Sequence, residues 1–131
     1  MKTLSKQPEP ENQPENSPEG MIRGHLYEIL EKGDWAIRIR AAGVLVDLND
    51  PRGWAFLASA IRHPERDIRG AVVEVLEEYG GLDAVDMLEN TLDDQDPEIR
   101  VAAARALDAL YQQHPPKNPG ILAIVNTILQ G

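Results

Sequence analysis

The sequence predicts an all-α fold, a right-handed α-solenoid of about seven helices in which antiparallel helix pairs stack side by side. One similar phrase occurs three times, as "IRIRAAGVL" from Ile37, "IRGAVVEVL" from Ile68 and "IRVAAARAL" from Ile99. The copies are 31 residues apart (68 − 37 and 99 − 68), and a fixed period of this length is typical of stacked repeats. Apolar residues recur in each copy at helical spacing, and one copy alone is too short to bury them.

The first helix of each repeat is preceded by an acidic residue: Asp34, Glu65 or Asp96. Asp34 and Asp96 are favourable N-caps, and Pro97 stands at the first helical position, where its missing N–H is not needed. We therefore expect these helices at residues 35–48, 67–79 and 97–112.

A second helix follows in each repeat after a short turn. Leu57 and Leu88 are 31 residues apart, and Leu26 falls on the same position one interval earlier, in the second half of a truncated leading repeat. The last repeat departs from the period, because "YQQHPPKNPG" lengthens the link and the second helix aligns only at an offset of 36. The second helices are expected at residues 22–32, 53–62, 83–93 and 120–130.

The segment "DPEIRVAAARALDAL" from Asp96 resembles the first helix of a HEAT-like repeat, of the short type found also in phycobilisome lyase subunits. The resemblance rests on the Asp-Pro entry, on the pair Ile99 and Arg100, and on the alanine-rich helix that follows. It extends over about residues 22–131 and implies a stacked-helix fold. Proteins of this family act mostly as scaffolds and adaptors, whereas some are lyase subunits and others bind DNA, so the resemblance leaves the activity open.

The first twenty residues, "MKTLSKQPEPENQPENSPEG", contain four of the ten prolines and almost no apolar side chains. Such a segment buries too little surface to offset its loss of conformational entropy, so we expect a disordered tail over residues 1–20 and the helical repeat domain over residues 21–131. The tail lacks the apolar run of a signal peptide, and no stretch reaches the roughly 18 apolar residues of a membrane span. With no cysteine for disulfides, a cytoplasmic protein without membrane contact is expected.

The net charge of −9 is unevenly distributed. Residues 23–69 carry eight basic and seven acidic side chains, a net of +1, whereas residues 70–131 carry three basic and eleven acidic ones, a net of −8. An acidic surface repels phosphate backbones, which argues against nucleic acid as a partner. It suits another protein with a basic surface, although acidity also serves solubility.

The sequence contains no recognisable catalytic or metal-binding motif. His25, His63 and His114 have no ligand-like spacing, and "DDQDPE" lacks the glycine and distal glutamate of a calcium loop. No nucleophile stands beside an evident base. We therefore expect no enzyme activity, no cofactor and no metal. The alternative, which the resemblance implies, is a subunit of a bilin-lyase-like or other enzyme complex.

One charged position carries the same residue in all three complete repeats: Arg38, Arg69 and Arg100. Stacking would place these arginines beside the acidic residues that precede the helices. We expect a ladder of ion pairs that sets the register between repeats rather than the stability, because an exposed pair contributes only about 0–1 kcal/mol. An anion-binding stripe is the alternative interpretation.

The second helices are expected to line one face of the solenoid and to carry the binding surface. One column of this face is acidic, with Asp86, Glu89 and Asp93. At the offset of 36 the same column in the last helix is aliphatic, with Leu122, Val125 and Leu129. Either the last helix tilts inward and buries this stripe, or the stripe is an exposed docking or homodimerisation edge.

Two aromatic residues complete the candidate surface. Trp35 occupies a position held by Arg66 and Pro97 in the other repeats and is expected near the surface, either at an interface or over the preceding helix end. Phe56 belongs either to the core between repeats or to a concave apolar patch. The resulting hypothesis is a small non-enzymatic adaptor or scaffold that binds a partner protein through the second-helix face and the C-terminal helix.

Overall fold

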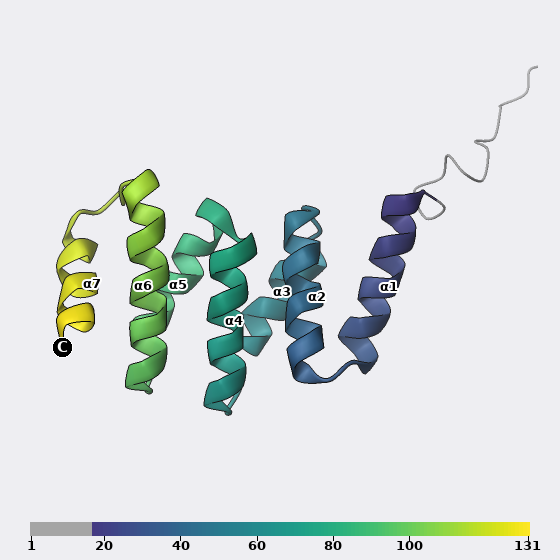
Figure 1. Ribbon diagram of the computed structural model, residues 1–131, viewed down its shortest axis with the longest axis horizontal. Coiled ribbons are helices and arrows are strands. Elements are labelled where there is room, and N and C mark those ends of the chain that lie inside the picture. The colour runs from purple at the N-terminus through teal and green to yellow at the C-terminus, as the bar shows by residue number, and fades with distance from the viewer. Residues whose placement is uncertain (1–16) are drawn as a thin grey trace, which may run out of the picture.

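The computed structural model describes residues 17–131, and every regular element in this part of the chain is helical. Figure 1 shows these elements in chain order. They are α1 (Pro18–Lys32), α2 (Trp35–Asp47), α3 (Pro51–Ala60), α4 (Arg66–Tyr79), the short 3₁₀ helix η3 (Gly81–Ala84), α5 (Val85–Thr91), α6 (Pro97–Gln113) and α7 (Gly120–Gln130).

The helices stack along one direction as an α-solenoid (Figure 1). α2, α4 and α6 form one row, in which α2 packs against α4 and α4 packs against α6. α3 and α5 lie behind that row, where α3 packs against α2 and α5 packs against α6. α1 and α7 close the two ends of the stack. The predicted all-α solenoid is confirmed.

Acidic N-caps start two helices of the front row, as predicted. The side chain of Asp34 accepts a hydrogen bond from the Ile37 amide (3.1 Å) and that of Asp96 from the Glu98 amide (2.8 Å). These bonds satisfy amides that lack a partner at a helix start. Glu65 precedes α4 without a capping bond, in keeping with the preference for the shorter Asp, Asn and Ser at this position.

The helical region begins earlier than predicted. Ser17 caps α1, since its hydroxyl accepts a hydrogen bond from the Gly20 amide (3.0 Å), and Pro18 is the first helical residue. The first helix thus begins four residues before the expected start at residue 22 (22 − 18), because Ser17 and Pro18 form a helix start. The rest of the predicted tail, residues 1–16, lies outside the described residues.

The core lies between the helix rows and follows the repeat. The three leucines of one repeat position, Leu45, Leu76 and Leu107, are each 0% exposed. Ile99, at another repeat position, is 4% exposed, whereas the equivalent Ile37 is 50% exposed because α2 is the first helix of the front row. Among residues 17–131, no helix combines the length and the apolarity that a membrane crossing requires.

Candidate functional site

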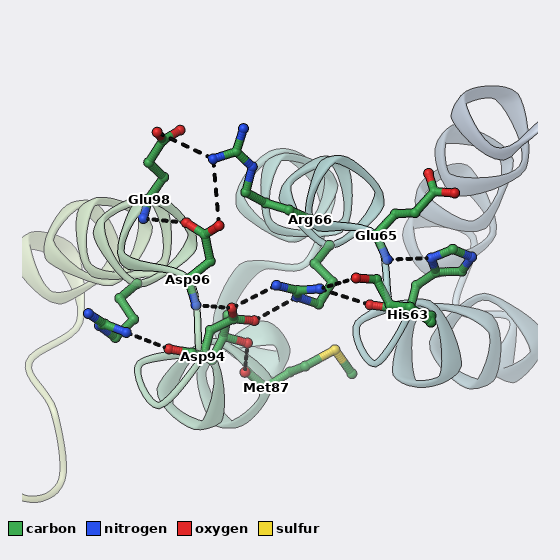
Figure 2. A network of polar contacts seen from close by, with 11 residues as sticks. His63, Glu65, Arg66, Met87, Asp94, Asp96 and Glu98 are labelled. Atoms are coloured by element: carbon green, nitrogen blue, oxygen red, sulfur yellow. Dashed lines mark hydrogen bonds and ion pairs between the residues drawn. The ribbon is translucent and has the colours of Figure 1, made fainter.

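A buried arginine, Arg69, joins two repeats, and Figure 2 shows the polar network around its partner Asp94. Arg69 is 5% exposed. Its guanidinium donates twice to the carboxylate of Asp94, at 2.8 and 3.0 Å, and once each to the carbonyl oxygens of His63 and Pro64, both at 3.0 Å. Asp94 also accepts a hydrogen bond from the Asp96 amide at 2.9 Å. The pair therefore fixes the turn before α6 against the turn before α4.

The same contacts set the charge state of the pair. Burial by itself raises the pKa of Asp94, but the hydrogen bonds from Arg69 and from the Asp96 amide, together with the charges of Arg69 and Arg100, outweigh it. The pKa of Asp94 consequently lies below its ordinary value of 3.8. The hydrogen bond to Asp94 raises the pKa of Arg69, so both partners are ionised at neutral pH.

The arginines do not form the predicted ladder with the acidic column. Arg69 pairs with Asp94, and within the described part of the chain neither Arg38 nor Arg100 belongs to an ion pair. Arg100 instead donates to the carbonyl oxygen of Asp94 at 2.7 Å. The prediction was wrong in its partners. Arg69 binds the carboxylate two residues before the cap Asp96, whereas Arg38 and Arg100 donate to main-chain oxygens.

Arg38 lies among aromatic rings at the start of α2. Its guanidinium carbon is 4.4 Å from the ring centroid of Trp35 and 5.1 Å from that of Phe56. The Trp35 centroid is 5.8 Å from that of Phe56 and 4.7 Å from that of His63. Trp35 and Phe56 are half-buried and pack against the core. The two aromatic residues that the sequence singled out thus belong to one cluster around Arg38, a cation–π arrangement.

A groove of about 810 Å³ lies at the C-terminal end of the stack. One wall comes from η3 and α5, and the other from the end of α6, the link that follows it and the start of α7. We call it the C-terminal groove, and its principal lining residues are Leu82, Asp83, Asp86, Glu89, Tyr111, Lys117, Ile121 and Ile124. A volume of this size lies within the range of about 300–1,000 Å³ that is typical of ligand-binding clefts.

α7 faces the groove with other side chains than the predicted stripe. Val125 is 1% exposed and Leu129 is half-buried against the core, while Leu122 is 37% exposed. Ile121 and Ile124 line the groove, and Ile124 is 50% exposed. Val125 is thus a core residue, which agrees with the alternative in which the last helix buries the stripe, although Leu122 stays exposed. Neighbouring residues on a helix are about 100° apart, so a shift of one residue changes the face.

The groove combines exposed apolar side chains with carboxylates. Leu82 is 54% exposed, and the adjacent Asp83 and Asp86 are exposed as well. At the base of the groove, the Tyr111 hydroxyl donates to the Glu89 carboxylate at 2.5 Å. Burial above all, and then the hydrogen bond and charge of Glu89, raise the pKa of Tyr111. The hydroxyl therefore stays protonated and keeps the base of the groove in place.

Asp93, the third acid of the predicted column, lies outside the C-terminal groove. It lines a smaller hollow of about 440 Å³ between α3 and α5, together with Arg62, Asp86 and Met87. Asp86 lies on the rim of both hollows. The acidic column is therefore divided between two surfaces rather than forming one stripe.

The repeat geometry has a counterpart among known families. The sequence profile described as HEAT repeats matches residues 24–113, which is 90 of the 131 residues (113 − 24 + 1). The chain belongs to the HEAT repeat family. Comparison with curated proteins and with solved structures gave no match.

HEAT repeats are generally scaffolds for protein–protein interaction and typically non-catalytic. In residues 17–131, no group of three His, Asp or Glu side chains is placed so as to hold a metal ion. The HEAT repeat match ends at the last residue of α6, so the link and α7 add a wall of the C-terminal groove from outside the matched region.

The three aliphatic residues among the principal lining residues, Leu82, Ile121 and Ile124, escaped the sequence analysis. Leu82 stands in the short turn before the second helix expected at residues 83–93, and no binding role was predicted for that turn. Ile121 and Ile124 lie in the correct helix, but the link before it is five residues longer than the period requires (36 − 31). That irregularity was the available signal, because it leaves the rotation of the last helix undetermined by the repeat.

Proposed function

We propose that this HEAT repeat protein is a non-enzymatic adaptor or scaffold that binds a partner protein through the C-terminal groove. The segment bound there is amphipathic, with aliphatic side chains toward Leu82 and Ile124 and lysine or arginine side chains toward Asp83 and Asp86. The observation that carries the proposal is the pairing of two half-exposed aliphatic walls, at 54% and 50% exposure, in one groove.

Exposed aliphatic side chains that face one another across a hollow lose water when a complementary apolar surface enters. Burying apolar area is worth about 25 cal/mol per Å², and interface cores are depleted in charge while their rims stay polar. In this groove the carboxylates of Asp83 and Asp86 are exposed. Such an arrangement favours a partner that is apolar at its centre and basic at its edge.

The charge of the whole C-terminal half supports the same partner. Residues 70–131 carry a net charge of −8, from three basic and eleven acidic side chains. The opposite groove wall contributes Lys117 and His114, which do not balance this excess. Electrostatic attraction of a basic segment raises association rates, and this effect weakens as salt is added.

The test uses the full chain and the synthetic peptide acetyl-LKKLLKKL-amide, whose leucines share one helix face. Leu82→Glu combined with Ile124→Glu places charges on both apolar walls, and both side chains are exposed enough for the fold to persist. We expect the peptide to bind about tenfold more weakly, a change of about 1.4 kcal/mol. The variant adds negative charge, so attraction by charge alone would give tighter binding instead.

Met21→Glu combined with Ile22→Glu is the matched control, because these residues are 58% and 50% exposed on α1 at the far end of the stack. The control should bind the peptide as the unmodified chain does, and fluorescence anisotropy measures all three affinities. Equal weakening in both variants, or none in the groove variant, would show that the groove is not the binding site.

A further inference from the structure

Arg38 occupies the repeat position of Arg69 but lacks the carboxylate that Arg69 binds. The partner of Arg69 is Asp94, 25 residues further along the chain (94 − 69), and the residue 25 positions after Arg38 is His63 (63 − 38). A histidine thus stands in the first complete repeat where the second has an aspartate.

Matching hydrogen bonds confirm that His63 and Asp94 are structurally equivalent. The Glu65 amide donates to His63 Nδ1 at 3.0 Å, and the Asp96 amide donates to Asp94 Oδ1 at 2.9 Å. Figure 2 shows both turns, with His63 beside Glu65 and Asp94 beside Asp96. His63 therefore replaces Asp94 as the acceptor within the turn, but an imidazole offers neither a carboxylate oxygen nor a negative charge to a guanidinium.

The guanidinium of Arg38 is held in place while most of its donors remain available. Its Nε donates to the Leu30 carbonyl oxygen at 2.7 Å, and its guanidinium carbon lies over the rings of Trp35 and Phe56. In the described residues its two terminal nitrogens have no hydrogen-bond partner. Neither is among the fully buried unpaired atoms, and the residue as a whole is partly exposed. A guanidinium fixed by stacking loses little further side-chain entropy when it binds a carboxylate.

We propose that Arg38 and the rings of Trp35, Phe56 and His63, together the Arg38 site, bind a carboxylate carried by an acidic segment of a partner protein. The carboxylate supplies the negative charge that Asp94 supplies to Arg69. It accepts two hydrogen bonds from the terminal nitrogens of Arg38, because the Nε of Arg38 already donates to the Leu30 carbonyl oxygen. The aromatic rings pack against the aliphatic part of the segment.

The setting of the Arg38 site differs from that of the C-terminal groove. Residues 23–69 carry a net charge of +1, against −8 for residues 70–131, so this half of the chain does not repel an acid. The site lies at the edge where α1 turns into α2, whereas the link from α6 to α7 lies at the opposite edge (Figure 1). The two sites therefore bind partner segments of opposite charge, and a variant of one site should leave binding at the other unchanged.

Tryptophan fluorescence reports on the site directly. The chain has two tryptophans, and Trp54→Phe in the full chain leaves Trp35 as the single reporter. The probes are the peptide acetyl-LDELDL-amide and its neutral counterpart acetyl-LNQLNL-amide. We expect the acidic peptide to give a saturable change and to bind at least about tenfold more tightly than the neutral one, as two charge-assisted hydrogen bonds require.

Arg38→Gln should remove the preference for the acidic peptide. Arg100→Gln is the matched control, because Arg100 has the same repeat position and also donates to a main-chain oxygen (2.7 Å), yet it lies outside the aromatic cluster. The control should keep the preference, as should the Leu82→Glu and Ile124→Glu variant of the groove. Equal binding of the two peptides to the Trp54→Phe chain would overturn the proposal by itself. An equal loss of the preference for the acidic peptide in Arg38→Gln and in Arg100→Gln would also overturn it.

Discussion

The buried pair of Arg69 and Asp94 allows a direct test of how consecutive repeats are held together. In Asp94→Asn the guanidinium remains at 5% exposure but loses its anionic partner, and the carbonyl oxygens of His63 and Pro64 remain as acceptors. Removing one member of a buried ion pair costs about 3–5 kcal/mol. Because two of the four guanidinium hydrogen bonds survive and asparagine still offers one oxygen, we expect a loss at the lower end, about 3 kcal/mol.

Thermal and urea unfolding followed by circular dichroism measures this loss. For the 115 described residues (131 − 16), a loss of about 3 kcal/mol lowers the Tm by about 12 °C. Asp93→Asn is the matched control, since it removes the neighbouring exposed carboxylate, which forms no ion pair in the described residues. The control should stay within about 0.5 kcal/mol of the unmodified chain. If both variants unfolded alike, the pair would not be what joins these repeats.

Two further predictions concern acid and close packing. Burial raises the pKa of Asp50 and Asp94, yet hydrogen bonds from Tyr27 and Arg69, among other contacts, leave both pKa values below 3.8 in the folded chain. The two carboxylates therefore stabilise the fold fully above the unfolded pKa of about 3.9, and this stabilisation is lost as pH falls below about 4. Urea unfolding should show a steep loss of unfolding free energy in that range, and the loss should be shallower in Asp94→Asn. Gly53→Ala would bring a Cβ within 2.6 Å of the Ala42 carbonyl oxygen, and we expect unfolding to become easier by about 2 kcal/mol. In Gly70→Ala the new Cβ meets only the movable Ile99 Cδ1 at 3.3 Å, so the same assay should show unchanged or slightly higher stability, by up to about 1 kcal/mol.

The helices and their stacking could be predicted because local signals and the repeat agree. Asp34 and Asp96 cap helices where the sequence placed them, and Leu45, Leu76 and Leu107 are buried as one position of a stacked repeat must be. Each such assignment depends on neighbours within a few residues, and the same signal recurs in three copies of the repeat. That redundancy is why helix positions were correct while individual side-chain partners were not.

Side-chain partners depend on turn geometry, which the period does not encode. Arg69 was expected to meet a cap residue, but the turn before α6 brings the carboxylate of Asp94 to it instead, two residues before the cap Asp96. A difference of two residues in the sequence is thus enough to change the carboxylate that Arg69 binds. The same limit applies to α7, where the longer link places Ile124 in the groove and Val125 in the core.

Both candidate sites lie where the repeat rule is broken, and the reason is physical. A repeat position that obeys the rule is already occupied, as Asp94 occupies the guanidinium of Arg69. Replacing that aspartate by His63 one repeat earlier leaves the guanidinium of Arg38 with open donors. Lengthening the link by five residues (36 − 31) likewise leaves Ile124 beside Leu82 across a groove rather than against another helix. In this solenoid the two irregular positions therefore leave exposed groups that the stacking of the repeats does not satisfy.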